Sequence, residues 1–77
     1  MDKEKKNRRD KYLKDLGKKV REARENKGYS QHELASIAQI PKNQVGRIER
    51  GEINTSVFTL QEVAEALEVN ITQLLTK

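Results

Sequence analysis

The chain has 77 residues, of which 34% are hydrophobic and 36% charged, and it carries a formal net charge of +4. This length suits one small domain with a single, lean core, and the absence of cysteine excludes disulfides and cysteine-ligated zinc. No apolar run approaches the roughly 20 residues of a membrane-spanning helix, and the N-terminus lacks the apolar stretch of a signal peptide, so we expect a soluble, cytoplasmic protein without a membrane partner.

The positive charge is concentrated in the first third of the chain. Residues 1–27 contain twelve Lys or Arg against six Asp or Glu, whereas residues 28–77 contain four against six. Such asymmetry favours a polyanionic partner, nucleic acid before a membrane surface. The alternative is a solvated helix face of mixed charge.

Residues 1–9, MDKEKKNRR, contain no apolar side chain after Met1. Because they have nothing to bury, we expect a basic, flexible N-terminal arm or the frayed start of a helix. The cations of this segment either lie along phosphates or in a minor groove, where they would raise the affinity for DNA, or stay solvated.

The spacing of apolar residues predicts five short helices and no strand. Within each segment the apolar residues recur at steps of three and four, which places them on one helix face. The predicted helices span about residues 10–26, 31–38, 42–50, 57–67 and 71–76. We therefore predict an all-α, compact five-helix domain over residues 10–77.

Short local signals mark the helix boundaries. Ser30–Glu33 (SQHE) and Asn70–Gln73 (NITQ) read as capping boxes, and Ser56 suits an N-cap. Pro41 ends the preceding helix and suits the first turn of the next. Ile53, in the loop that follows the third predicted helix, is expected to contact the core.

The second and third predicted helices are joined by only about three residues, which is typical of a helix-turn-helix. Since Val45 and Ile48 point inward, the third helix has an outward face with amides and cations and almost no carboxylate. The outward residues are Lys42, Asn43, Gly46, Arg47 and Arg50. Arginine can donate two hydrogen bonds to guanine, and asparagine can pair twice with adenine, so this face suits the major groove of DNA.

The segment GYSQHELASIAQIPKNQVGRIERGEINTSVFTLQEVAEALEVNITQLL resembles the Cro/lambda-repressor-like helix-turn-helix domain, the XRE family, and with the first helix the resemblance covers about residues 12–76. The residues that carry it are Ser30-Gln31, Glu33-Leu34-Ala35, Ile40, Val45, Ile48-Glu49-Arg50-Gly51, Leu60, Ala64, Leu67, Val69 and Leu74-Leu75. The resemblance implies a lambda-repressor-like fold and a repressor-like, sequence-specific transcriptional regulator. Such a protein inserts the third helix into the major groove, as a homodimer on a palindromic operator.

The resemblance also implies roles for single residues. The positions expected to contact bases are Lys42, Asn43 and Arg47. The positions expected to contact the DNA backbone are Gln31 and Arg50, to which we add Gln44, which points sideways on the third helix. Arg24 and Glu49 match a partly buried ion pair that ties the first helix to the third. Gln39 and Glu68 stand where the family often has glycine, and Pro41 replaces a common serine or threonine.

No catalytic or metal site is predicted, so we expect neither an enzyme nor a cofactor. His32 is the only histidine and has no cysteine beside it to complete a metal site. A restriction–modification controller would fit as well as a stand-alone repressor. The alternative is an antitoxin or another protein-interaction module of the same fold, with a contact patch drawn from Ile37, Val57, Phe58 or Leu75. Ile37 is interpreted as partly buried core, Leu74 as core, and the end of the last helix as core or dimer contact.

Overall fold

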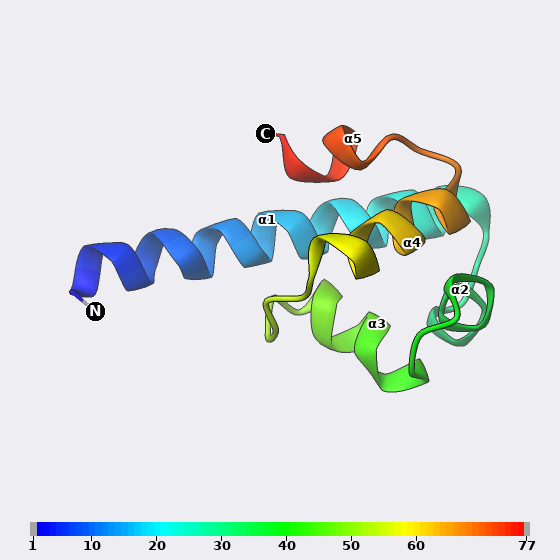
Figure 1. Cartoon of the computed structure of the whole chain (residues 1–77), viewed down its shortest axis with the longest axis horizontal. Helices are drawn as coiled ribbons and strands as arrows, with labels where there is room; N and C mark the ends of the chain where they lie inside the picture. Colours follow the sequence, from blue (N-terminus) through cyan, green and yellow to red (C-terminus); the bar gives the residue numbers. More distant parts are fainter. Residues whose placement is uncertain (1, 77) are drawn as a thin grey trace.

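Helix α1 (Lys3–Lys27) is the longest helix in the computed structural model, which describes residues 2–76, and three of the four shorter helices pack against it (Figure 1). The shorter helices are α2 (Gln31–Ala38), α3 (Lys42–Glu49), α4 (Val57–Leu67) and α5 (Ile71–Leu75). Helix α3 packs against α1 and α2, α4 against α2 and α5, and α5 against α1. No strand occurs among residues 2–76, and the prediction of an all-α, five-helix fold is confirmed.

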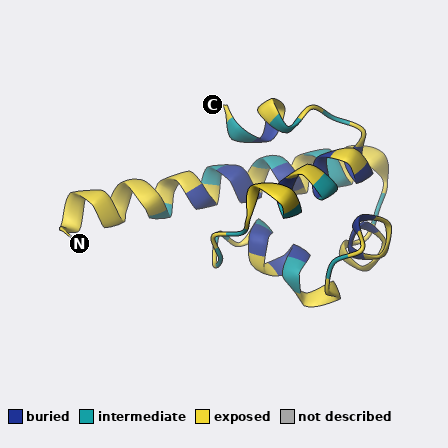
Figure 2. Cartoon of the chain, viewed as in Figure 1, coloured by how far each residue is buried: buried dark blue, intermediate teal, exposed yellow. Residues whose placement is uncertain are grey.

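The prediction that the first helix begins near residue 10 is wrong. Helix α1 begins at Lys3, and the Asp2 carboxylate accepts a hydrogen bond from Lys5 N at 2.8 Å. Residues 2–9 are exposed and continue α1 beyond the rest of the fold (Figure 2). The apolar stripe marks where α1 is packed, whereas Lys, Arg and Glu are good helix formers that extend it further. The flexibility expected of residues 1–9 stays a prediction.

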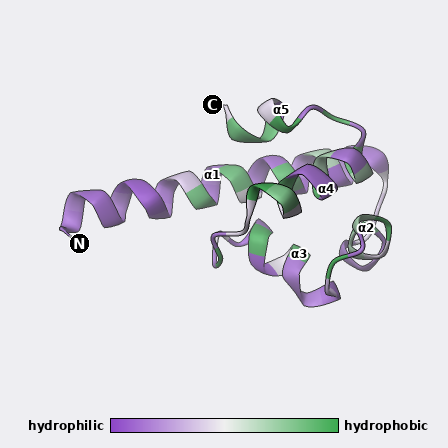
Figure 3. Ribbon diagram, in the orientation of Figure 1, coloured by the Kyte–Doolittle hydropathy of each residue, from purple (hydrophilic) through white to green (hydrophobic). Residues whose placement is uncertain are grey.

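The core is aliphatic and takes residues from every helix. Its most deeply buried large side chains are Val20, Leu34, Val45, Ile48, Val63 and Leu67. The first turns of α1 are hydrophilic, whereas hydrophobic residues recur along the rest of α1 and along α3, α4 and α5 (Figure 3). Leu74 is buried, and Ile53 and Leu75 are half-buried against the core, but Ile37 is 50% exposed. The interpretation of Ile37 as partly buried core is therefore wrong.

Two of the predicted start signals, Ser30 and Ser56, cap the helices that they precede. Ser30 Oγ accepts from Glu33 N at 3.0 Å, and the Glu33 carboxylate accepts from Ser30 N at 2.8 Å. The backbone hydrogen bond from Ser30 lowers the pKa of Glu33. Ser56 Oγ accepts from Thr59 N at 3.1 Å, whereas Pro41 contributes no side-chain cap.

Two helix ends use residues other than glycine in the left-handed region. Gln39, in the turn between α2 and α3, has φ of 58°, and Glu68, after α4, has φ of 60°. Each carries a conformational cost on the order of 1 kcal/mol that glycine would avoid. Gln39 thus adopts a backbone conformation that is locally unfavourable, because the residues on either side of it, Ala38 and Ile40, pack in or against the core.

Gly17 brings α1 and the end of α3 into backbone contact. A Cβ atom at this position would lie 2.4 Å from the carbonyl oxygen of Ile48 and 2.5 Å from that of Glu49. Only glycine allows the two helices to approach this closely. From the sequence alone, Gly17 is a residue that weakens the helix, whereas in the structure it allows α3 to pack on α1.

Candidate nucleic-acid interface

A surface hollow of about 330 Å³ lies along the exposed side of α3, and we refer to it as the α3 hollow. It is lined by Gln31, Lys42, Asn43, Gly46, Arg47 and Arg50. Five of the six residues predicted to contact DNA therefore share one concave surface, and no carboxylate lines it. Lys42 and Asn43 are in the first turn of α3, and Arg47 is one turn further on, all three exposed.

Gly46 faces the α3 hollow, as its assignment to the outward face predicts, but it is buried because neighbouring side chains cover it. A Cβ atom there would lie 3.0 Å from Arg50 Nη1 and 3.3 Å from Gln31 Oε1. The side chains of Gln31 and Arg50 thus cross over the glycine. Its missing side chain makes room for two neighbours expected to contact the DNA backbone.

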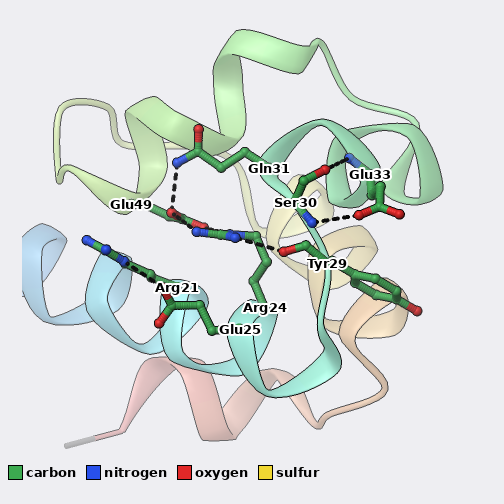
Figure 4. A network of polar contacts seen from close by, with 8 residues as sticks. All are labelled: Arg21, Arg24, Glu25, Tyr29, Ser30, Gln31, Glu33 and Glu49. Carbon is green, nitrogen blue, oxygen red and sulfur yellow. Dashed lines mark hydrogen bonds and ion pairs between the residues drawn. The ribbon is translucent and has the colours of Figure 1, made fainter.

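Glu49 holds Gln31 in this position and pairs with Arg24 behind it (Figure 4). Gln31 Nε2 donates to Glu49 Oε1 at 2.9 Å. Arg24 donates from Nε to Glu49 Oε2 at 2.6 Å and from Nη2 to Oε1 at 3.1 Å. Arg24 Nη1 also donates to the carbonyl of Tyr29 at 2.8 Å. One carboxylate therefore links α1, the start of α2 and the end of α3.

The Arg24–Glu49 ion pair implied by the resemblance is present and is largely excluded from solvent. The Arg24 side chain is 12% exposed and the Glu49 side chain 4%. Hydrogen bonding to Glu49 raises the pKa of Arg24, although burial opposes it. Removing one partner leaves the other charge buried and unpaired, so substituting either residue alone strongly destabilises the fold.

Gln44 and Arg50 each have a side-chain partner in the loop after α3. Gln44 Nε2 donates to Thr55 Oγ1 at 3.2 Å, which ties α3 to the loop after it. Arg50 forms an ion pair with Glu52, at 2.7 Å between Nε and Oε2. Sequence reasoning missed Glu52 and Thr55, because a loop residue has no periodic position that would signal which side it faces.

Two absences hold for residues 2–76. No group of three or more His, Cys, Asp or Glu side chains is arranged to hold a metal ion. None of the helices is long and apolar enough to cross a membrane. His32 is exposed on the first turn of α2.

The α2–turn–α3 unit with its exposed polar face defines a helix-turn-helix protein. Residues 20–74 match the family model described as helix-turn-helix, and the chain belongs to that family. The resemblance to Cro/lambda-repressor-like domains is thereby confirmed.

Proteins with known names and solved structures that are similar to this chain include transcriptional regulators and restriction-modification controllers. The chain is 40% identical over 60 residues to the HTH-type transcriptional regulator SlrR of Bacillus subtilis, covering 77% of this chain but 40% of SlrR. It is 36% identical over 62 residues to control protein C.SmaI of Serratia marcescens, and the match covers 80% of this chain and 74% of C.SmaI. The crystal structure of the restriction-modification controller protein C.AhdI from Aeromonas hydrophila superposes with a TM-score of 0.79 at 35% identity, covering 80% of this chain and 94% of that one.

Proposed function

We propose that this chain is a sequence-specific, DNA-binding transcriptional regulator of repressor-like action, and that α3 enters the major groove. The α3 hollow carries this proposal, because it gathers amides and cations on one concave surface without a carboxylate. DNA presents phosphate oxygens and base acceptors to such a surface. A regulator of this kind acts in the cytoplasm by binding rather than by catalysis.

Within the α3 hollow, we assign base contacts to Lys42, Asn43 and Arg47. All three are exposed, and they lie on the N-terminal turns of the recognition helix, where base contacts concentrate. We assign phosphate contacts to Gln31 at the start of α2, to Gln44 in α3 and to Arg50 at the end of α3. The exposed N–H groups at the starts of both helices add to phosphate binding.

A homodimer on a palindromic operator completes the proposal. One α3 spans only a few base pairs, and a two-fold pair of such modules reads half-sites about 34 Å, or about 10 base pairs, apart. The relatives C.SmaI and C.AhdI support a controller as readily as a stand-alone repressor.

A binding selection from random duplexes with the purified protein tests the function directly. We expect enrichment of a palindromic motif with two half-sites about one helical turn apart. Enrichment of no motif, with no shift of any duplex at low salt, would rule the proposal out.

A protein-interaction module, such as an antitoxin, is the second candidate. It is favoured by Val57 and Phe58, which are 71% and 73% exposed at the start of α4. Adjacent large apolar side chains of this exposure are typical of interaction sites. Co-purification with another protein, without binding to any duplex, would select this candidate over the first.

A further inference from the structure

Four helices of this chain end in the same backbone motif. A left-handed residue donates its N–H to the carbonyl three residues back, and the next residue donates to the carbonyl five residues back, as in a Schellman motif. The left-handed residues are Gly28, Gln39, Gly51 and Glu68. The residues that follow them are Tyr29, Ile40, Glu52 and Val69.

Glu52 departs from the pattern that its three counterparts share. Tyr29, Ile40 and Val69 are half-buried and pack against the core, which is the apolar contact that commonly accompanies this motif. Glu52 is an exposed carboxylate in the corresponding place after α3. Its backbone is still held, since Glu52 N donates to the carbonyl of Arg47 at 2.9 Å. Glu52 thus has the fixed backbone of its counterparts without their role in packing.

The Glu52 carboxylate is directed at Arg50, which lines the α3 hollow. Its Oε2 accepts from Arg50 Nε at 2.7 Å, and its Oε1 accepts from Nη2 at 3.2 Å. The hydrogen bond from Arg50 lowers the pKa of Glu52, and the charge of Arg47 adds to that effect, so the carboxylate is ionised at neutral pH. A phosphate binds a guanidinium through the same paired donors.

We propose that Glu52 is an internal competitor for DNA, because it occupies the guanidinium edge of Arg50 that a backbone phosphate would take. It lowers the affinity for every duplex alike and leaves sequence preference unchanged, since Arg50 faces phosphates rather than bases. This inference rests on the proposed function and adds to it a residue that sets affinity. The opposite role, in which Glu52 holds Arg50 ready for a phosphate, makes the opposite prediction.

The test compares Glu52→Gln with the wild type on a labelled random-sequence duplex, by fluorescence anisotropy over a series of KCl concentrations. Glutamine keeps the size and polarity of the side chain and removes its charge. We expect the variant to bind about two- to fivefold more tightly per protomer, the range that an exposed ion pair supports. The slope of log K against log salt should steepen by about one per protomer, since Arg50 then neutralises a phosphate.

Two controls separate this competition from a general effect of charge. Glu22→Gln makes the same charge change on the exposed surface between α1, α4 and α5, and should bind like the wild type. In the Arg50→Ala background, adding Glu52→Gln should change nothing. Thermal unfolding of each variant, followed by circular dichroism, shows that the fold is kept.

The inference is overturned if Glu52→Gln binds no more tightly than the wild type, if Glu22→Gln gains as much, or if the gain persists without Arg50. Each of these results leaves the proposed function standing, because the wild type still binds. A wild type that binds no duplex at low salt overturns the proposed function, and this inference with it.

Discussion

At the scale of single residues, the α3 hollow is lined both by side chains that would read bases and by side chains that would contact the DNA backbone. Arg47 is exposed, and within residues 2–76 its side chain forms no hydrogen bond to another side chain. Its guanidinium is therefore available to a base edge. Gln31 is instead held by Glu49 at 2.9 Å, at the rim formed by the start of α2. This difference in position predicts different consequences for their removal.

Arg47→Ala should reduce discrimination at one or two base pairs, by about 1–3 kcal/mol. Gln31→Ala is the matched comparison, because it should weaken binding to all sequences alike. Competition binding with a panel of single-base operator variants measures both effects. If Arg47→Ala discriminates among these duplexes as well as the wild type does, Arg47 does not read a base.

Gly46→Glu should weaken DNA binding more than it weakens folding. The new side chain would displace Gln31 and Arg50, which lie 3.3 and 3.0 Å from the Cβ position, and would put a carboxylate into the α3 hollow. Duplex affinity and thermal unfolding measured on the same sample give the two effects.

Gly46→Ala is the control for this substitution. Its single methyl group meets only the ends of two long side chains, which can shift by a few tenths of an ångström, and alanine gains up to about 1 kcal/mol of helix propensity over glycine. Its folding stability should therefore be close to that of the wild type. Unchanged affinity in Gly46→Glu would show that this face of α3 is turned away from the duplex.

At the scale of elements, the orientation of α3 is set by its contacts at both ends. Its last turn lies on the backbone of α1 at Gly17, and Glu49 joins it to Arg24 of α1 and to Gln31 of α2. At its start, Gln39 accepts a left-handed conformation so that the turn from α2 can close. The recognition helix is thus held by contacts outside its own eight residues.

Gly17→Ala should destabilise the fold by about 2 kcal/mol, within the range for overpacking. The gain in helix propensity is at most about 1 kcal/mol, and the atoms that the methyl group meets are backbone carbonyls that cannot rotate away. Urea unfolding measures the change, and Lys18→Ala, one residue along on the exposed side of α1, is the control. A Gly17→Ala variant as stable as Lys18→Ala would show that α3 can move aside without cost.

At the scale of the whole molecule, the N-terminal turns of α1 extend beyond the packed part of the fold and are rich in basic residues. The long axis of the fold measures 37 Å against 23 and 20 Å, and the N-terminal turns of α1 project along it (Figure 1). These turns carry five of the basic residues and have no apolar side chain to bury. A helix of this kind presents its cations at regular spacing, which a disordered arm would not.

Replacing Lys5, Lys6, Arg8 and Arg9 together by glutamine should weaken binding to all duplexes and leave sequence preference intact. Each phosphate contact that is lost should reduce the slope of log K against log salt by about 0.9. Salt titrations of duplex binding measure this slope, and circular dichroism shows whether α1 persists. An unchanged slope would mean that the N-terminal turns remain solvated in the complex.

The sequence by itself determined the five helices, most of their caps and the composition of the face that α3 exposes. These follow from spacing at steps of three and four and from capping residues that act within one turn, so they are local properties. The start of α1 was missed because polar helix formers carry no apolar stripe. Ile37 was misplaced because it lies at the edge of a stripe, where periodicity does not decide burial.

Only the tertiary structure decided what lies across from each residue. It placed Gly17 against the carbonyls of α3, Gly46 beneath Gln31 and Arg50, and Glu52 on the guanidinium of Arg50. The contacts of Gly17 and Gly46 join different helices, so their geometry depends on how the helices are seated against one another, and a pattern along one helix does not contain that information. The contact between Arg50 and Glu52 depends on the backbone turn that follows α3.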